Sequence, residues 1–71
     1  MKIAMTPVKS SMLDGHGYDA KTKTLAVSFA GGKTYHYEGV PPEVAAGLAG
    51  ADSAGKFFAA HIRNRYTGKA V

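Results

Sequence analysis

Strict alternation of apolar and polar side chains marks the middle of the chain. Between residues 24 and 29, Leu25, Val27 and Phe29 alternate with small or polar residues, a spacing that is typical of a half-buried β-strand. Residues 33–38 alternate in the same way. The glycines between the two segments permit the positive φ angles that a tight turn requires. The pattern therefore predicts a β-hairpin in this part of the chain.

The segment before this hairpin is less regular. Residues 8–18 mix apolar and polar side chains, and Gly15 and Gly17 interrupt the pattern. Glycines within a strand often mark a bulge, so we expect a first strand here with an irregularity at the glycines. Residues 1–7 lack periodicity and end in a proline, which has no backbone donor, so we expect a flexible N-terminal arm.

Two helices are predicted after the hairpin. Pro41 and Pro42 end the sheet, because proline cannot donate to a strand ladder. Proline also suits the first turn of a helix, and we expect a short helix over residues 43–48. A second helix is expected over residues 54–66, with Asp52 or Ser53 as a side-chain cap at its start.

Apolar residues recur every four positions in the second helix. Phe58, Ile62 and Tyr66 form one stripe that can cover the sheet, and residues 67–71 are expected to be a frayed C-terminal tail. The predicted fold is α+β, a three-stranded antiparallel β-meander followed by two α-helices packed on one face. One domain is expected over residues 8–66, because a chain of 71 residues is too short for a second.

Composition narrows the possible compartments. The chain contains no cysteine, which excludes disulfides and thiolate metal sites and fits the reducing cytoplasm. No apolar run approaches the ~20 residues that cross a membrane. We therefore expect a soluble cytoplasmic protein that has no membrane partner.

Positive charge points to a polyanionic partner. Nine Lys and Arg against five Asp and Glu give a net charge of +4, and a field of this sign attracts nucleic acid. The predicted second helix carries Lys56, His61, Arg63 and Arg65, with Lys69 just beyond and no acid after Asp52. These cations suit contacts with phosphate. They are also favoured at a helix C-terminus by the helix dipole, except Lys56, which lies near the start.

The Tyr35-His36-Tyr37 triplet has two interpretations. The tyrosines could form an exposed platform on which nucleobases stack, with Tyr18 as a further ring. Alternatively, both rings pack under the helices with their hydroxyls at the rim. Because Leu25 and its neighbours also need a covered face, we favour packing on that face. His36 would then be exposed on the opposite face of the sheet.

Catalytic and metal-binding patterns are absent from the sequence. The spacing of His16, His36 and His61 matches no metal motif, and no acid orients a nucleophile beside any of them. The segment from Ser53 to Lys56 superficially looks like a phosphate loop but lacks its glycine spacing. A capped helix start explains it better, and its free N–H groups could hold one phosphate. We expect neither an enzyme nor a bound cofactor or metal.

A series of short motifs then resembles the KTSC domain family. The resemblance covers about residues 6–66. It rests on these segments: Val8-Lys9-Ser10-Ser11, Gly17-Tyr18-Asp19, Leu25-Ala26-Val27-Ser28-Phe29, Gly32, Tyr35-His36-Tyr37, Val40-Pro41, the run from Ala51 to Phe58, Ile62-Arg63 and Tyr66. The family's recurring positions fall on Ser10, Ser11, Tyr18, Tyr35, Tyr37, Ser53, Gly55, Arg63 and Tyr66. No catalytic residue is carried over.

The resemblance implies a function by association. The KTSC family takes its name from the C-terminus of some lysyl-tRNA synthetases and also occurs as stand-alone small bacterial and phage proteins. Attachment to an enzyme that charges tRNA suggests RNA binding. We expect a small non-enzymatic module that binds nucleic acid, RNA rather than DNA, as a monomer or weak homodimer. The candidate contacts are Lys56, Arg63, Arg65, Tyr18, Tyr35, His36, Tyr37, Ser53 and Lys69. The alternative is a protein-interaction module, such as a phage-encoded accessory protein or inhibitor that docks on a host protein.

Overall fold

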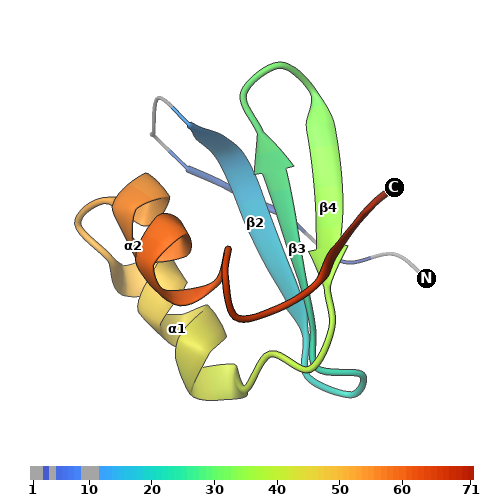
Figure 1. Ribbon diagram of the computed structural model, residues 1–71. Coiled ribbons are helices and arrows are strands. Elements are labelled where there is room, and N and C mark those ends of the chain that lie inside the picture. The colour runs from blue at the N-terminus through green and yellow to red at the C-terminus, as the bar shows by residue number, and fades with distance from the viewer. Residues whose placement is uncertain (1–2, 4, 9–11) are drawn as a thin grey trace.

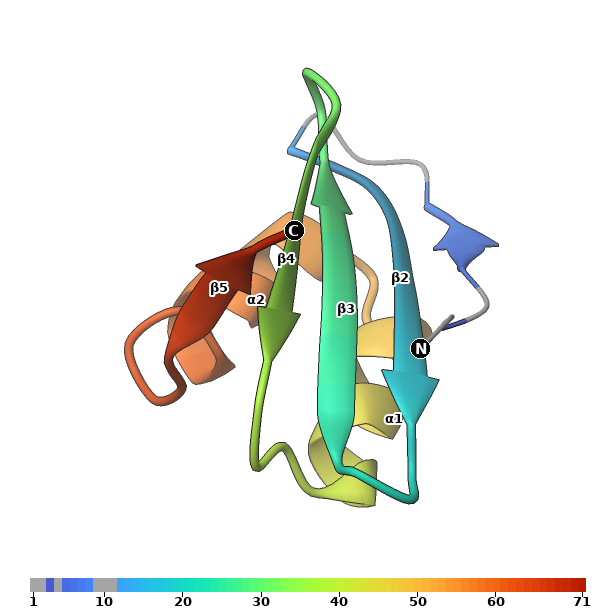
Figure 2. The same cartoon turned by 90° about the vertical axis from the view of Figure 1, so that its right-hand side faces the viewer.

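A computed structural model describes residues 3, 5–8 and 12–71. Within this part of the chain, an antiparallel sheet of five strands is ordered as in the sequence, from β1 to β5 (Figure 2). The strands are β1 (Thr6–Pro7), β2 (Leu13–Asp19), β3 (Thr24–Phe29), β4 (Lys33–Tyr37) and β5 (Gly68–Ala70). Two helices, α1 (Pro42–Gly50) and α2 (Ala54–His61), lie between β4 and β5 in the sequence.

The predicted hairpin is formed by β3 and β4. Leu25 pairs with Tyr37, Val27 with Tyr35 and Phe29 with Lys33. Residues that pair directly across an antiparallel sheet share a face, so the tyrosines lie on the face of the apolar β3 residues. The turn between the strands contains Gly31 and Gly32 at φ angles of 105° and 89°. Only glycine adopts such angles without strain, which explains the Gly-Gly pair.

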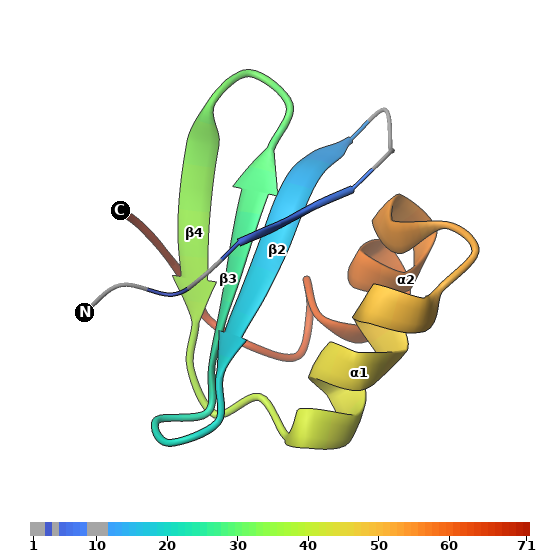
Figure 3. The same ribbon diagram turned by 180° about the vertical axis from the view of Figure 1, so that it is seen from behind.

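Both helices cover one face of the sheet, as predicted (Figures 1 and 3). The Ser53 hydroxyl accepts a hydrogen bond from the Lys56 N–H and caps α2. Among the described residues, the core lies between helices and sheet and contains Leu13, Leu25, Val27, Tyr37, Val40, Ala45, Leu48, Ala54, Phe58 and Ile62. The other face of the sheet has no helix on it (Figure 2).

The expected first strand is present as β2. Its register with β3 shifts between Leu13 and Gly15, which confirms the irregularity predicted at the glycines. A Cβ added at Gly15 would lie 3.0 Å from the Thr6 carbonyl oxygen of β1. The glycine therefore lets the two backbones approach each other. Ser10 and Ser11 lie outside the described residues.

The prediction of three strands was wrong in number. Thr6–Pro7, expected in the arm, pair with His16 and Gly15, and Gly68–Ala70, expected in the frayed tail, pair with β4. Both added strands lie at the edges of the sheet and contain two or three residues. Pairing at an edge depends on backbone hydrogen bonds, and so short a segment has no room for an alternating pattern.

The second helix is shorter than the spacing of its apolar residues indicated. The Phe58 carbonyl accepts hydrogen bonds from the N–H groups of both Ile62 and Arg63, which ends α2 at His61. A tight turn follows, in which the Tyr66 N–H donates to the Ile62 carbonyl. This turn prolongs the four-residue spacing without being a helix. Arg63 therefore lies after α2, not on it.

None of the helices in the described residues is long and apolar enough to cross a membrane.

Gly68 is predicted to be required for the close packing of β5 against the Tyr37 ring. A Cβ at this position would lie 2.5 Å from Cε2 of the buried Tyr37 ring. Gly68→Ala should therefore lower the free energy of unfolding by about 1–3 kcal/mol, the usual cost of overpacking. Chemical denaturation measures this change. Gly50→Ala is the control, since no atom lies within 4 Å of its added Cβ, and it should be neutral or stabilising. Equal stability of the two variants would contradict this packing.

Candidate functional site

The two tyrosines of β4 lie on the helix-covered face of the sheet. Tyr37 is only 7% exposed and belongs to the core, whereas Tyr35 is half-buried against it. This confirms the preference for packing over an open stacking platform. The tyrosines do not share an exposed sheet surface, and any ligand must reach them from the rim between sheet and helix.

Four aromatic rings form a closed cycle at that rim, which we name the aromatic quartet: Phe29, Tyr35, Tyr37 and Phe58. Phe58 of α2 contacts Phe29 and Tyr37 with centroid separations of 5.2 and 5.5 Å, both near perpendicular. Phe29 contacts Tyr35 at 5.6 Å, and Tyr35 contacts Tyr37 at 6.5 Å. Each such pair stabilises the packing by about 0.5–1.5 kcal/mol beyond burial. The quartet thus ties α2 to the hairpin.

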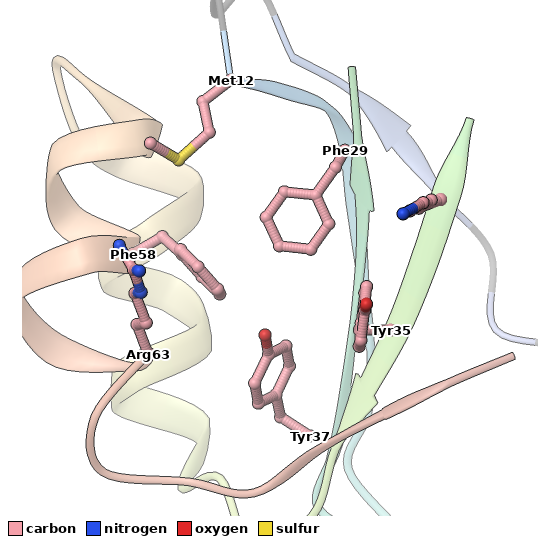
Figure 4. A pocket seen from close by; sticks show the side chains of 7 residues that line it. Met12, Phe29, Tyr35, Tyr37, Phe58 and Arg63 are labelled. Atoms are coloured by element: carbon pink, nitrogen blue, oxygen red, sulfur yellow. The ribbon is translucent and has the colours of Figure 1, made fainter. Parts of the chain in front are cut away.

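A cleft of about 290 Å³ lies among these rings (Figure 4). The quartet lines it together with Met12, Lys33 and Arg63. Figure 4 shows Met12 and Phe58 on the helix side, Tyr35 on the sheet side and the hydroxyl of Tyr37 pointing into the space between them. No acidic residue lies among the described lining residues. The interior is therefore aromatic and the charged side chains are both positive.

Two separate elements supply these charges. Lys33 is exposed at the start of β4, where it pairs with Phe29. Arg63 is exposed directly after α2, and its backbone N–H donates to the Phe58 carbonyl. The end of the helix and the hairpin therefore each fix one cation beside the cleft.

The Tyr37 hydroxyl stays protonated at neutral pH. Burial raises its pKa, and Tyr35 adds to the rise, while the positive charge of Arg63 opposes it. A protonated phenol can donate a hydrogen bond to a ligand in the cleft. The arrangement as a whole suits a ligand with a planar aromatic part and an adjacent anion, which Arg63 can bind through its guanidinium.

Tyr18 has a structural contact of its own. Its hydroxyl donates a hydrogen bond to the Val40 carbonyl, which ties the end of β2 to the segment that leads into α1. Burial raises the pKa of Tyr18, and the nearby Glu43 and Asp19 add to the rise. Tyr18 does not line the aromatic cleft.

The remaining predicted contacts are scattered over the molecule. His36 pairs with Lys69 of β5, and both lie on the face of the sheet without helices. Ser53 and Lys56 lie at the start of α2, and Arg65 is exposed in the turn after it. The structure therefore brings together Tyr35, Tyr37 and Arg63 of the predicted set. The expected basic stripe on one helix does not form, because α2 ends before both arginines.

Several residues of the cleft were not among the predicted contacts. Phe29 and Phe58 looked like core residues, Lys33 looked like part of a turn, and Met12 had no pattern to mark it. The signal that could have identified Lys33 is the hairpin register, which places it opposite Phe29 and two residues from Tyr35. Phe58 could not be placed this way, because its contacts depend on how α2 docks.

The three histidines come from different places. His16 lies on β2. His36 lies on β4, on the face of the sheet that has no helix. His61 ends α2, and its ring centroid lies 4.5 Å from that of Phe57. Among the described residues, no group of three His, Cys, Asp or Glu could hold a metal ion.

Comparison with known proteins then identifies the family. The family model of the KTSC domain matches residues 9–66, which is most of the chain. The chain belongs to the KTSC domain family. The resemblance inferred from the sequence is therefore confirmed. The matched range contains all seven residues that line the aromatic cleft.

Sequences similar to this chain occur both as a protein of about the same length and as a small part of a larger protein. A protein of Tsukamurella paurometabola is 42% identical over 67 residues, which cover 94% of this chain and 100% of that protein. A lysine–tRNA ligase of Nostoc punctiforme is 34% identical over 58 residues, 82% of this chain but 10% of the ligase. The crystal structure of a KTSC domain protein from Yersinia pestis shares 31% identity and a TM-score of 0.93, with 99% of both chains covered.

Alkaline pH is predicted to weaken the core of this KTSC domain through Tyr37. The raised pKa means that the folded state favours the neutral phenol more than the unfolded state does, where the pKa is near 10.0. This contribution is complete below that pH and is lost as pH rises through the folded-state pKa. The free energy of unfolding should therefore fall more steeply at high pH in the wild type than in Tyr37→Phe. Denaturation between neutral and alkaline pH measures both slopes, and parallel curves would contradict the assignment.

Proposed function

We propose that this KTSC domain is a small non-enzymatic module that binds nucleic acid, and RNA in preference to DNA. The observation that carries the proposal is the aromatic cleft with Lys33 and Arg63 beside it and no acid among its described lining residues. Aromatic side chains beside cations are the usual means by which proteins bind single-stranded nucleic acid. In this proposal the two cations contact phosphate at the mouth of the aromatic cleft.

The attraction to phosphate is local to the cleft and does not come from a charge difference between the two ends of the sheet. The β2–β3 turn end carries Asp19 but also Lys21 and Lys23, and Asp14 lies near the β3–β4 turn. Lys33 and Arg63, which line the cleft, therefore supply the attraction to a negative strand. Arg65, exposed two residues after Arg63, can contact a further phosphate.

Similarity to a lysine–tRNA ligase supports RNA as the ligand by association. The matched segment is a small part of an enzyme that handles tRNA. A shared domain does not by itself carry a function, so the weight of the proposal rests on the cleft. We further propose that the module acts in the cytoplasm, as a monomer or weak homodimer.

Salt-dependent binding is the first prediction of this proposal. Labelled single-stranded RNA should bind at low salt, and the logarithm of the affinity should fall linearly with the logarithm of the salt concentration. Arg63→Ala and Lys33→Ala should each weaken binding by roughly tenfold and reduce that slope by about 0.7, the value for one lost phosphate contact in a single strand. Fluorescence anisotropy at several salt concentrations measures both quantities.

Lys21→Ala is the matched control for these variants. It removes the same charge from an exposed position in the turn between β2 and β3, at the far end of the sheet from the cleft. It should change neither the affinity nor the slope appreciably. If Lys21→Ala weakens binding as much as Arg63→Ala, the net charge explains the binding and the cleft does not. If RNA does not bind at low salt, the nucleic-acid proposal is wrong.

A further inference from the structure

The aromatic cleft has features that identify its ligand more closely, and this inference rests on the proposed function. We infer that the cleft takes one unstacked base of a single-stranded RNA, while Lys33 and Arg63 hold the phosphates on either side of that nucleotide. The inference assigns the base to the quartet and the backbone to the two cations. Size, ring geometry and charge each support it.

Size limits the cleft to one base. Pockets for small ligands usually measure about 300–1,000 Å³, and the 290 Å³ of this cleft lies just below that range. A row of stacked bases needs an open surface such as a bare sheet. The face of this sheet that carries the tyrosines is covered by α1 and α2 (Figure 1). A base must therefore leave its stack to reach Tyr35 or Tyr37.

The rings of the quartet are arranged as a floor and walls. Tyr37 and Phe58 are 7% and 3% exposed and form the floor, whereas Phe29 and Tyr35 are half-buried and form the walls. Neighbouring rings stand at 72–82° in three of the four contacts. Because adjacent rings of the quartet already touch, a planar base cannot enter between them. It can lie against the half-buried Phe29 and Tyr35 and meet the face of one ring and the edge of the other, both favourable arrangements.

Charge at the mouth favours a nucleotide over a neutral aromatic ligand. Lys33 comes from the hairpin and Arg63 from the turn after α2, so the two cations are fixed by different elements of the fold. A nucleotide within a strand has a phosphate on each side of its base. A strand can therefore satisfy both cations while its base is in the cleft. A paired base in a duplex cannot enter without breaking its pair.

The Tyr37 hydroxyl adds a polar contact at the floor. It points into the space among the side chains that line the cleft (Figure 4). A ring nitrogen or carbonyl oxygen at the edge of a base can accept from it. The other groups that line the cleft are aromatic or aliphatic apart from Tyr35 and the two cations. The cleft should consequently tolerate different bases and hold purines better, because purines offer more surface for stacking.

An abasic strand tests this inference directly. A short adenosine oligonucleotide and a sugar–phosphate strand of the same length without bases carry the same charge, so both should bind through the cations. If a base enters the cleft, the abasic strand should bind more weakly by between about fivefold and 150-fold at the same salt concentration. The wild-type protein suffices for this comparison, which does not depend on any variant folding.

Variants then place the effect in the cleft. Tyr35→Leu should reduce the difference between the two strands while leaving the affinity for the abasic strand unchanged, since Leu keeps apolar packing without a ring. Tyr18→Phe is the control, because Tyr18 is an aromatic residue outside the cleft, and it should preserve the full difference. Circular dichroism confirms that both variants are folded.

The outcomes separate this inference from the proposed function. Equal binding of the two strands overturns base capture but leaves nucleic-acid binding intact. Failure of both strands to bind at low salt overturns both. Adenosine monophosphate that binds as tightly as the oligonucleotide, or duplex RNA that binds as tightly as the single strand, overturns the assignment to an unstacked base within a strand.

Discussion

The contact of Phe58 with the β3–β4 hairpin is the constraint on which the rest of this KTSC domain depends. Phe58 is almost fully buried and touches both Phe29 and Tyr37, so one side chain of α2 joins the two strands of the hairpin. Its carbonyl also ends the helix by accepting from two N–H groups. The same residue therefore docks the helix, sets where it ends and places Arg63 beside the cleft. In so small a chain, structure and candidate site share residues.

The short strands at the two edges of the sheet add further packing contacts. The backbone of β5 lies against the ring of Tyr37, and the close approach is possible because Gly68 has no side chain. At the other edge, Gly15 allows β1 to approach β2. A chain of this length buries only about 60% of the surface that its unfolded form exposes. Two short strands that cover backbone and ring edges therefore matter more here than they would in a larger domain.

Sequence patterns predicted the elements in which apolar residues recur at a regular spacing. The alternation in β3 and β4 identified the hairpin and its apolar face. The two cap candidates, Asp52 and Ser53, located the start of α2, and the structure shows Ser53 as the cap. The same patterns missed β1 and β5, whose pairing depends on backbone hydrogen bonds and not on side-chain period. They also extended α2 to Tyr66, because a turn can keep apolar residues four apart.

The candidate site was predicted only in part, because it depends on tertiary contacts that local sequence patterns do not show. Tyr35, Tyr37 and Arg63 carried visible signals as a tyrosine pair and a basic residue. The cleft forms where the hairpin, α2 and the following turn come into contact. A local sequence pattern does not predict contacts between elements that are distant in the sequence. Lys56, His36 and Lys69 have suitable chemistry but lie on other surfaces. Residue type therefore suggested the ligand class, and only the tertiary contacts located the site.

The central claim is that ligand binding and helix docking occur at the same aromatic cleft. Heteronuclear NMR of the isotope-labelled protein, titrated with single-stranded RNA, tests it most directly. The account predicts that the largest shift changes fall on Phe29, Lys33, Tyr35, Tyr37, Phe58 and Arg63, with little change in the turn between β2 and β3. Changes concentrated on the helix-free face of the sheet, around His36 and Lys69, would contradict it.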